Sequence, residues 1–337
     1  MEMKAVMKID ANEGRCVLDS AQLARVLSPE VARRYPQASR LEARLASHFS
    51  VDPSQVLATA GADDAIDRAF RALAGPRGSI LSTVPGFVEF LDAATRTQAE
   101  FIPVHRGKQF PLEEFCAAVR REKPSIAIVA SPDNPWGTAL SGEEFSAIAQ
   151  ACADSGTTFI LDITYGDFAD SQDLLAPALK APGVLATGSF SKSRGLAGFR
   201  AGWAMAGSPS LGLLEKLREA GPPYSLSSPA IEAVIIALDE AQEKYGEFVR
   251  EIRWEREELV RLVLRRGYET WPQQGNFVTL KAPDAGRFAQ AMKERGAAVR
   301  HWPGSALAEG LVRVTCPGDR EEFLLLTEIL GSMEALA

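Results

Sequence analysis

The sequence is poor in the residues that build metal sites, disulfide frameworks and histidine-based catalytic centres. It holds only 4 cysteines and 3 histidines among 337 residues, and the histidines are far apart in the chain. The cysteines have no C-x-x-C spacing, so we expect reduced thiols rather than disulfides or a metal site. They are Cys16, Cys116, Cys152 and Cys316.

Other absences exclude further classes of protein. The net charge is −7 at pH 7, whereas nucleic-acid binders usually carry a basic excess. No stretch approaches eighteen consecutive apolar residues, as a membrane-spanning helix would need. Residues 1–10 lack the long apolar core of a signal peptide. The sequence therefore predicts a cytoplasmic protein that binds neither nucleic acid nor a membrane.

Short apolar runs alternate with amphipathic segments through the middle of the chain. One such segment, residues 142–155, has the spacing of a half-buried helix. The alternation predicts an α/β domain with a mostly parallel central sheet sandwiched by helices, in which ligands gather at the carboxyl ends of the strands. The expected strands are residues 78–83, 100–104, 125–130, 157–162 and 183–188.

The last third of the chain has a different pattern. A long, highly charged helix is expected over residues 230–266, followed by strand-like runs at 275–280 and 311–315 that alternate with two helices. This order predicts a small α+β domain, since 337 residues exceed the usual limit of one core. We expect an N-terminal arm (1–33) that contributes to the small domain and the active-site entrance, a large cofactor-binding domain (34–235) and a small C-terminal domain (236–337).

The segment Ser189-Phe-Ser-Lys-Ser-Arg-Gly-Leu-Ala-Gly-Phe-Arg200 is the most informative in the chain. A lysine can form a Schiff base with an aldehyde, and arginine and serine hydroxyls bind phosphate. One small molecule, pyridoxal phosphate, carries both groups. Taken alone, the segment could also be a solvated loop with basic residues.

Two more segments follow expected strands. Asp162 ends the strand at 157–162, where a carboxylate can pair with a protonated pyridine nitrogen, and Tyr165 comes three residues later. Without other support, an aspartate here is more often a helix cap or a turn residue. Asn134 lies in Ser131-Pro-Asp-Asn-Pro-Trp-Gly137, directly after another expected strand.

In combination and order, these segments resemble the fold-type I pyridoxal-phosphate-dependent aminotransferases (class I/II), in particular the histidinol-phosphate aminotransferase-like branch. The resemblance runs from about Ile9 to Leu330. It covers D-E-A-Y-x-x-F, with Ile-Thr replacing Glu-Ala, and N-P-x-N-P-T-G, with Trp136 replacing the threonine. It implies that Lys192 is the catalytic, cofactor-binding lysine and that Asp162 binds the ring nitrogen.

The same resemblance assigns the remaining contacts to the cofactor. Tyr165 and Asn134 are expected to hydrogen-bond the phenolate oxygen of the ring. The phosphate is expected to meet the hydroxyls and guanidinium of Ser189, Ser191 and Arg200.

Three weaker motifs complete the expected cofactor site. Gly61, Ala62 and Asp63 match a G-A-D-E segment that opens a helix, whose free N–H groups suit a phosphate. Phe87, in Pro85-Gly-Phe-Val-Glu-Phe90, matches the aromatic residue that covers the ring. Tyr35, in Arg34-Tyr-Pro36, matches a tyrosine that reaches the cofactor phosphate of the neighbouring subunit. If so, the protein is a homodimer with shared active sites.

Two arginines are expected to bind substrate. Arg313 matches the arginine of an L-R-I-[ST] strand that holds the substrate α-carboxylate, and Arg300 matches one that contacts a substrate phosphate. The alternative for either is a solvated arginine on an edge strand. The arm segment Asp10-Ala-Asn-Glu-Gly-Arg-Cys16 lacks the proline and aromatic residue found in the family, so the resemblance does not specify histidinol phosphate as substrate.

The predicted reaction is therefore transamination. Lys192 moves a proton as base and acid, and an amino group passes from an amino acid or amino-alcohol phosphate to a 2-oxo acid. Two alternatives remain at this stage. One is a pyridoxal-phosphate lyase on the same fold, of the threonine-phosphate decarboxylase kind. The other is a non-catalytic regulator that uses the fold.

Overall fold

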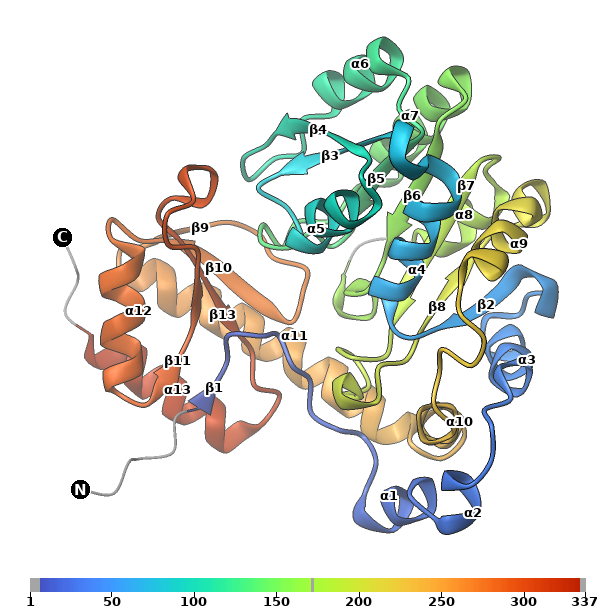
Figure 1. Cartoon of the computed structure of the whole chain (residues 1–337). Helices are drawn as coiled ribbons and strands as arrows, with labels where there is room; N and C mark the ends of the chain where they lie inside the picture. Colours follow the sequence, from blue (N-terminus) through green and yellow to red (C-terminus); the bar gives the residue numbers. More distant parts are fainter. Residues whose placement is uncertain (1–6, 171–172, 334–337) are drawn as a thin grey trace.

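The structure, a computed structural model, describes residues 7–170 and 173–333. The first six residues of the predicted arm and the last four of the predicted small domain lie outside the described residues. Figure 1 shows a large and a small lobe, with the long helix α11 (Gln242–Arg265) running between them. The N-terminal segment starts at the small lobe and crosses to the large one.

The large lobe is built on a 7-stranded sheet with the order β2-β8-β7-β6-β5-β3-β4. Strands β3 to β7 run parallel to one another, β8 is antiparallel to both of its neighbours, and the predicted mostly parallel sheet is therefore confirmed. The strands are β2 (Val56–Thr59), β3 (Ser79–Val84), β4 (Glu100–His105), β5 (Ile126–Ala130), β6 (Thr158–Asp162), β7 (Val184–Ser189) and β8 (Gly202–Met205).

Helices cover both faces of this sheet, as predicted. Along β5, Ile126 and Ile128 pack against one helical layer, while Ala127 and Val129 pack against the other. This alternation follows from the period of two residues in a strand. One layer holds α4 (Ala62–Ala69), α5 (Val88–Thr97) and α9 (Leu211–Ala220); the other holds α3 (Ala38–Phe49), α6 (Leu112–Glu122), α7 (Gly142–Ser155), α8 (Leu175–Lys180) and α10 (Ser228–Glu240).

Helix α7 has the bounds expected from the sequence. Ser141 and Glu144 form reciprocal side-chain-to-backbone hydrogen bonds at its start, which satisfy N–H groups that have no partner within the helix. Gly156 follows its end with a φ of 69°, a conformation that glycine adopts at low cost. Both ends were thus encoded locally.

The single helix expected over residues 230–266 is wrong. The structure has two helices, because α10 ends at Glu240 and α11 begins at Gln242. Ala241 between them has a φ of −119° and a ψ of 22°, outside the helical region. Alanine is the best helix former, so nothing in the local sequence marks this break. Helix α10 is buried against the large sheet, whereas α11 leads to the small lobe.

The small lobe contains a 4-stranded antiparallel sheet with the order β12-β13-β10-β9. Strand β1 pairs with β11 in a separate two-stranded sheet, so the N-terminal arm is joined to this lobe. The predicted α+β character is present, while the domain bounds 1–33, 34–235 and 236–337 stay a prediction. The elements are β1 (Met7–Lys8), β9 (Glu269–Thr270), β10 (Phe277–Lys281), α12 (Ala285–Glu294), β11 (Ala297–Ala298), β12 (Arg300–His301), β13 (Leu311–Thr315) and α13 (Arg320–Ser332).

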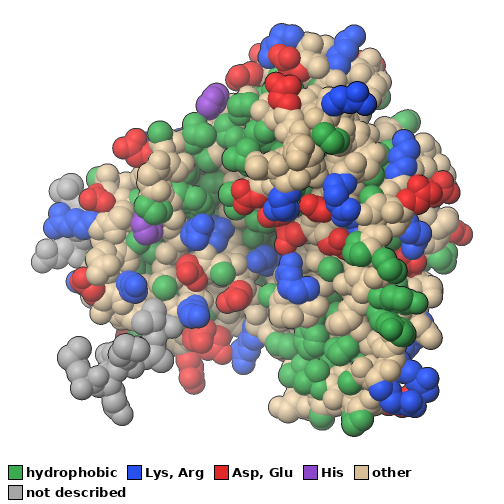
Figure 2. Space-filling view, viewed as in Figure 1, with side chains coloured by type: hydrophobic (Ala, Val, Ile, Leu, Met, Phe, Trp, Pro, Cys, Tyr) green, Lys and Arg blue, Asp and Glu red, His purple; other side chains and the backbone are tan. Residues whose placement is uncertain are grey.

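Two short helices, α1 (Ser20–Val26) and α2 (Pro29–Ala32), lie beside α10 under the large lobe (Figure 1). Figure 2 shows hydrophobic side chains gathered at the lower right of the molecule, the region where Figure 1 places these three helices. Among residues 7–170 and 173–333, no helix has the length and apolar character needed to cross a membrane.

Helix α11 carries a fully buried acid where it meets the small lobe. Glu255 accepts a hydrogen bond from the main-chain N–H of Gly318 at 2.8 Å through Oε2. Its Oε1 has no hydrogen-bond partner among the described residues. The pKa of Glu255 is raised to about 8, mainly by burial and in part by the negative charge of nearby Glu251.

A test of this acid is the substitution Glu255→Gln. The folded-state pKa lies above the unfolded value of 4.5, so the carboxyl group destabilises the fold progressively as pH rises from about 4.5 to about 8. A glutamine keeps the acceptor for Gly318 and removes the charge. We expect it to increase the free energy of unfolding at pH 9 by roughly 2–4 kcal/mol and to have little effect near pH 4.5.

Denaturant unfolding at both pH values measures this difference. Glu257→Gln is the matched control, because Glu257 lies on the same helix with its side chain 59% exposed. Equal unfolding curves for Glu255→Gln and the parent at pH 9 would show that Glu255 is not a buried charge.

Candidate active site

A cavity of about 540 Å³ lies between the lobes, at the carboxyl ends of β5, β6 and β7. This is where ligands bind in open α/β sheets, and the volume suits a small molecule. Almost all of the residues predicted from the sequence line it. They are Ala62, Asp63, Phe87, Asn134, Asp162, Tyr165, Ser189, Ser191, Lys192, Arg200, Arg300 and Arg313.

Lys192 lies in the loop after β7 and is partly buried. Its Nζ donates a hydrogen bond to the main-chain oxygen of Ala11 in the N-terminal arm, at 3.1 Å. The next residue, Ser193, donates from its hydroxyl to the carboxylate of Asp167. Because Asp167 follows Tyr165 closely, this bond ties the lysine loop to the segment that carries the tyrosine.

Asp162 is the last residue of β6 and is only 5% exposed. Its Oδ1 accepts from the Thr164 main-chain N–H at 3.0 Å and from the Thr164 hydroxyl at 2.7 Å. Burial raises the pKa of Asp162 to about 6, and the Thr164 bonds oppose this shift. Thr164 stands where the family motif has alanine, so the replacement supports the carboxylate directly.

The orientation of the Asn134 amide is set by Arg313. Arg313 Nη1 donates to Asn134 Oδ1 at 2.7 Å. A guanidinium has no acceptor, so the amide must present its oxygen here and turn Nδ2 elsewhere. Arg313 Nη2 donates to the Asp10 main-chain oxygen at 2.6 Å. Arg313 Nε is buried with no partner among the described residues, and burial lowers the pKa of this arginine.

A buried ion pair supports the loop that carries Asn134. Arg106 Nη1 lies 3.2 Å from Asp133 Oδ2, and both side chains are almost fully buried. Burial raises the pKa of Asp133, while the charge of Arg106 opposes that shift. Arg106 also donates to the Thr138 hydroxyl at 2.8 Å. Trp136 donates from its indole to the Pro85 main-chain oxygen at 3.0 Å, so it fixes the loop beside the segment of Phe87.

The cavity has an anion-binding end. Arg200 Nη1 donates to the Ser191 hydroxyl at 3.3 Å, and its Nη2 lies 2.8 Å from Asp63 Oδ2. The Ser189 hydroxyl donates to that of Ser191 at 2.9 Å. These groups lie at the start of α4, where main-chain N–H groups have no partner within the helix. The arrangement fits a phosphate group.

Gly61 does not line the cavity but shapes this end of it. It precedes α4 with a φ of 86°, a conformation that favours glycine. A Cβ atom at this position would lie 2.9 Å from Arg200 Nη2. A side chain at residue 61 would therefore displace the guanidinium.

Tyr35 lies outside the cavity of its own chain. Its side chain is 78% exposed and stacks on Tyr224, with the ring centroids 4.8 Å apart. The preceding Arg34 main-chain oxygen accepts a hydrogen bond from Ser228 at the start of α10. The role predicted for Tyr35 requires a second subunit, and the single chain leaves that prediction untested.

The sequence reasoning missed several residues that line the cavity. Asp10, Ala11 and Glu13 come from the N-terminal arm, and Trp302 comes from the small lobe beside Arg300. The sequence of the arm did indicate a role at the site, since its segment D-A-N-E matches the family motif. Nothing similar indicated Trp302, because one aromatic residue after a short strand has no distinctive spacing.

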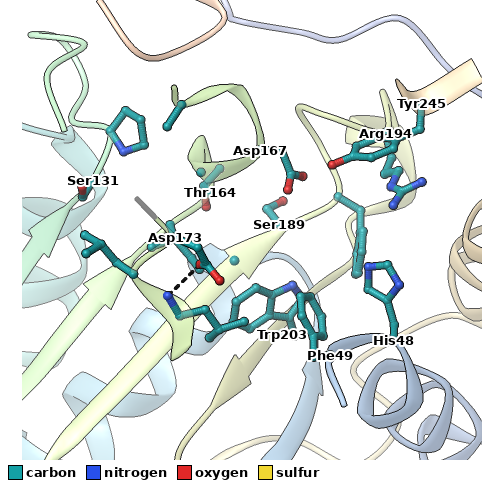
Figure 3. Close-up of a pocket in the computed structure, with 18 of the residues that line it drawn as sticks. His48, Phe49, Ser131, Thr164, Asp167, Asp173, Ser189, Arg194, Trp203 and Tyr245 are labelled. Carbon is teal, nitrogen blue, oxygen red and sulfur yellow. Dashed lines mark hydrogen bonds between the residues drawn. The ribbon is translucent and has the colours of Figure 1, made fainter. Parts of the chain in front are cut away.

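A second cavity, of about 400 Å³, adjoins the first, and Thr164 and Ser189 line both. Figure 3 shows Arg194 beside the ring of Tyr245 in this cavity, with the guanidinium 3.5 Å from the ring centroid. Neither Lys192 nor Asp162 lines it. Of these two cavities, only the first therefore brings together the residues that a pyridoxal-phosphate site needs.

Comparison with known proteins gives one consistent result. The family model for aminotransferase class I and II matches residues 11–329. The histidinol-phosphate aminotransferase of Chromobacterium violaceum is 30% identical over 333 residues, covering 96% of this chain and 91% of that protein. That of Haloquadratum walsbyi is 27% identical over 308 residues, covering 90% of this chain and 79% of that protein.

Solved structures share the fold over almost the whole chain. The histidinol-phosphate aminotransferase of Sinorhizobium meliloti, in complex with pyridoxal-5'-phosphate, has a TM-score of 0.86 at 23% identity, covering 97% of this chain and 92% of that one. The L-threonine-O-3-phosphate decarboxylase of Porphyromonas gingivalis has a TM-score of 0.79 at 22% identity, covering 97% and 99%.

These matches confirm the fold class, the aminotransferase activity and the pyridoxal phosphate cofactor predicted from the sequence. The family match covers both lobes and includes every residue described at the cavity except Asp10. The chain belongs to the class I and II aminotransferases.

Proposed function

We propose that this aminotransferase moves an amino group from an amino acid or amino-alcohol phosphate to a 2-oxo acid, with Lys192 as its catalytic residue. The observation that carries the proposal is the meeting of Lys192, Asp162 and Arg313 in one cavity, although they come from three separate parts of the chain. A lysine amine, a buried carboxylate and a buried guanidinium are the groups that this reaction needs.

When bound, pyridoxal phosphate supplies an aldehyde carbon and a ring that accepts electrons. Lys192 would hold that carbon covalently and, once released by substrate, would move a proton between the substrate Cα and the cofactor. Asp162 would keep the ring nitrogen protonated. Asn134 Nδ2, which Arg313 turns away from itself, would donate to the ring oxygen. Phe87 would cover the ring.

The two arginines indicate which groups the substrate carries. Arg313 Nε is a buried donor without a partner among the described residues, so an incoming carboxylate would complete its hydrogen bonds. Arg300 lies at the same cavity on the neighbouring strand β12, opposite Arg313 in register. We propose that it binds a second anionic group, a carboxylate or a phosphate, on the substrate side chain.

A decarboxylase remains the second candidate, because the fold is shared with the Porphyromonas gingivalis enzyme. The bond that breaks depends on which substituent of Cα stands perpendicular to the ring. A panel of amino donors followed for both 2-oxo acid and CO₂ separates the two reactions. CO₂ released at the rate at which the donor is consumed, with an amine product and no 2-oxo acid, would replace the transaminase proposal with the lyase.

The covalent role of Lys192 has a direct test. Borohydride reduction of the loaded protein should fix the pyridoxyl group on the peptide that contains Lys192. We expect Lys192→Ala to bind the cofactor without a reducible link, because Lys192 is the only lysine among the described residues that line the cavity. Peptide mapping by mass spectrometry measures this, and a pyridoxyl group on any other lysine would reject the site.

The substitution Asp162→Asn should have opposite effects on the stability of the cofactor-free protein and on the turnover of the loaded protein. In the cofactor-free protein the pKa of about 6 lies above the unfolded value of 3.8. Ionising this carboxylate therefore lowers the free energy of unfolding. The loss is complete above about pH 6 and disappears as pH falls towards about 4. We expect cofactor-free Asp162→Asn to be more stable at pH 7.5 by up to about 3 kcal/mol.

The loaded variant should behave in the opposite way and lose turnover by several orders of magnitude, because an amide cannot hold the ring nitrogen protonated. Thermal unfolding without cofactor and steady-state rates with it measure the two effects. Asp154→Asn, at an exposed position of α7, is the control. Turnover near that of the parent would make Asp162 only a turn residue.

We further propose a homodimer in which Tyr35 reaches the partner's cofactor phosphate. Tyr35, Tyr224 and Leu27 are large hydrophobic side chains left exposed at 78%, 63% and 65%. They lie at or beside α1, α2 and α10. Such a patch suits a second copy of this chain. The cytoplasmic location expected from the sequence stays a prediction.

Mixed dimers test the shared site. Tyr35→Phe weakens a phosphate contact, and Lys192→Ala abolishes the reaction. If Tyr35 acts in trans, one site of a mixed dimer receives intact Lys192 from one chain and intact Tyr35 from the other. That site should regain the full activity of a parental site when cofactor is limiting. The lost contact should weaken cofactor binding by about 1.5–3 kcal/mol in the Tyr35→Phe homodimer.

Differently tagged chains, purified as mixed dimers, allow the measurement. A mixed dimer with the same activity per intact Lys192 as the Tyr35→Phe homodimer would place Tyr35 in the site of its own chain or outside the site. An active species that sediments as a monomer would reject the dimer itself.

A further inference from the structure

Asn12, in the N-terminal arm, is buried at the edge of the active-site cavity and has a side chain with two well-defined partners. It is 1% exposed and has a φ of 53°, the left-handed conformation that asparagine tolerates better than most residues. Its Nδ2 donates to the Tyr165 hydroxyl at 3.0 Å. Its Oδ1 accepts from the Thr315 hydroxyl at 2.9 Å. The arm thus links β13 of the small lobe to the tyrosine of the large one.

The orientation of this amide follows from Thr315. The Thr315 oxygen already accepts from the Asn12 main-chain N–H at 3.2 Å, so its single hydrogen is available to donate. That hydrogen requires an acceptor, and Asn12 Oδ1 provides it. With the amide reversed, the hydroxyl hydrogen would have no acceptor among its described contacts, and buried donors without partners are costly. Nδ2 is therefore the group that faces Tyr165.

We infer that Asn12 is a positioning residue that fixes the direction in which Tyr165 donates. A phenol hydroxyl has one hydrogen, and Asn12 Nδ2–H already donates to its oxygen. Tyr165 cannot donate to that amide nitrogen, so its hydrogen is left for the cavity that the ring lines. This inference rests on the proposed function, in which the ring oxygen of pyridoxal phosphate receives that hydrogen. The relay runs from Thr315 to Asn12, then to Tyr165, then to the cofactor.

Neighbouring arm residues make this placement specific. Asp10 accepts from Arg313, and the Ile9 main-chain oxygen accepts from the Thr315 main-chain N–H at 3.1 Å. The Asn12 main-chain oxygen accepts from Asn276 Nδ2 at 3.2 Å. The arm is therefore held by main-chain contacts that do not involve the Asn12 amide. Removing that amide should alter Tyr165 while the arm stays in place.

The test is a spectrophotometric pH titration of the cofactor linked to Lys192. A hydrogen bond to the ring oxygen stabilises the negative charge that remains when the linkage loses its proton, so it lowers the pKa of that linkage. We expect Asn12→Ala to raise this titration midpoint by about 1 pH unit, because Tyr165 is then free to rotate. Thr315→Val should shift it in the same direction by freeing the amide to reverse.

Asn276→Ala is the matched control, since it removes an arm contact and leaves the relay intact; its midpoint should equal that of the parent. In a Tyr165→Phe background, Asn12→Ala should cause no further shift. An unmoved midpoint in both Asn12→Ala and Thr315→Val, or an equal shift in the Tyr165→Phe background or in Asn276→Ala, would overturn the inference. A parent protein without a Lys192-dependent titration would instead overturn the proposed function.

Discussion

The site depends on the hydrogen bonds that the Arg313 guanidinium donates. It belongs to β13 of the small lobe, yet it donates to the Asn134 side chain of the large lobe and to the Asp10 main-chain oxygen of the arm. A cation this deeply buried loses its hydration, and that cost is offset only while its donors have partners. One side chain therefore holds three parts of the chain in the arrangement that encloses the cavity.

Asp162 imposes the opposite constraint, because its charge is unfavourable until a ligand arrives. Burial raises its pKa to about 6, and the Thr164 bonds offset only part of that cost. A protonated ring nitrogen facing the carboxylate would remove most of the penalty. Cofactor affinity and folding stability are then linked through one residue, since whatever stabilises the ionised carboxylate stabilises the fold. Glu255 also has a raised pKa, but it lies on α11 and does not line the cavity, so a ligand bound there would not offset the cost of its charge.

Local signals explain how much could be predicted. The parallel strands and α7 were recognisable because apolar runs, a capping serine and a terminal glycine mark them within a few residues. The residues of the cavity were recognisable because they match motifs of the family, several of which follow strands that end at the same edge of the sheet. The break at Ala241 and the short strands β2 and β8 have no such local signal. The contact between Asn12 and Thr315 joins residues 303 positions apart, so only the folded chain reveals it.

Both hydrogen-bond donors expected at the ring oxygen are oriented from outside the large lobe. Arg313 turns the Asn134 amide, and Thr315, acting through Asn12, turns the Tyr165 hydroxyl. The two orienting residues lie two positions apart on β13, so their side chains point to the same face of the sheet. If both donors reach the ring oxygen as proposed, one strand of the small lobe would set the polarity at the ring. A shift of β13 relative to the large lobe would alter both donors together, and the position of the small lobe would then be coupled to the electronics of the reaction.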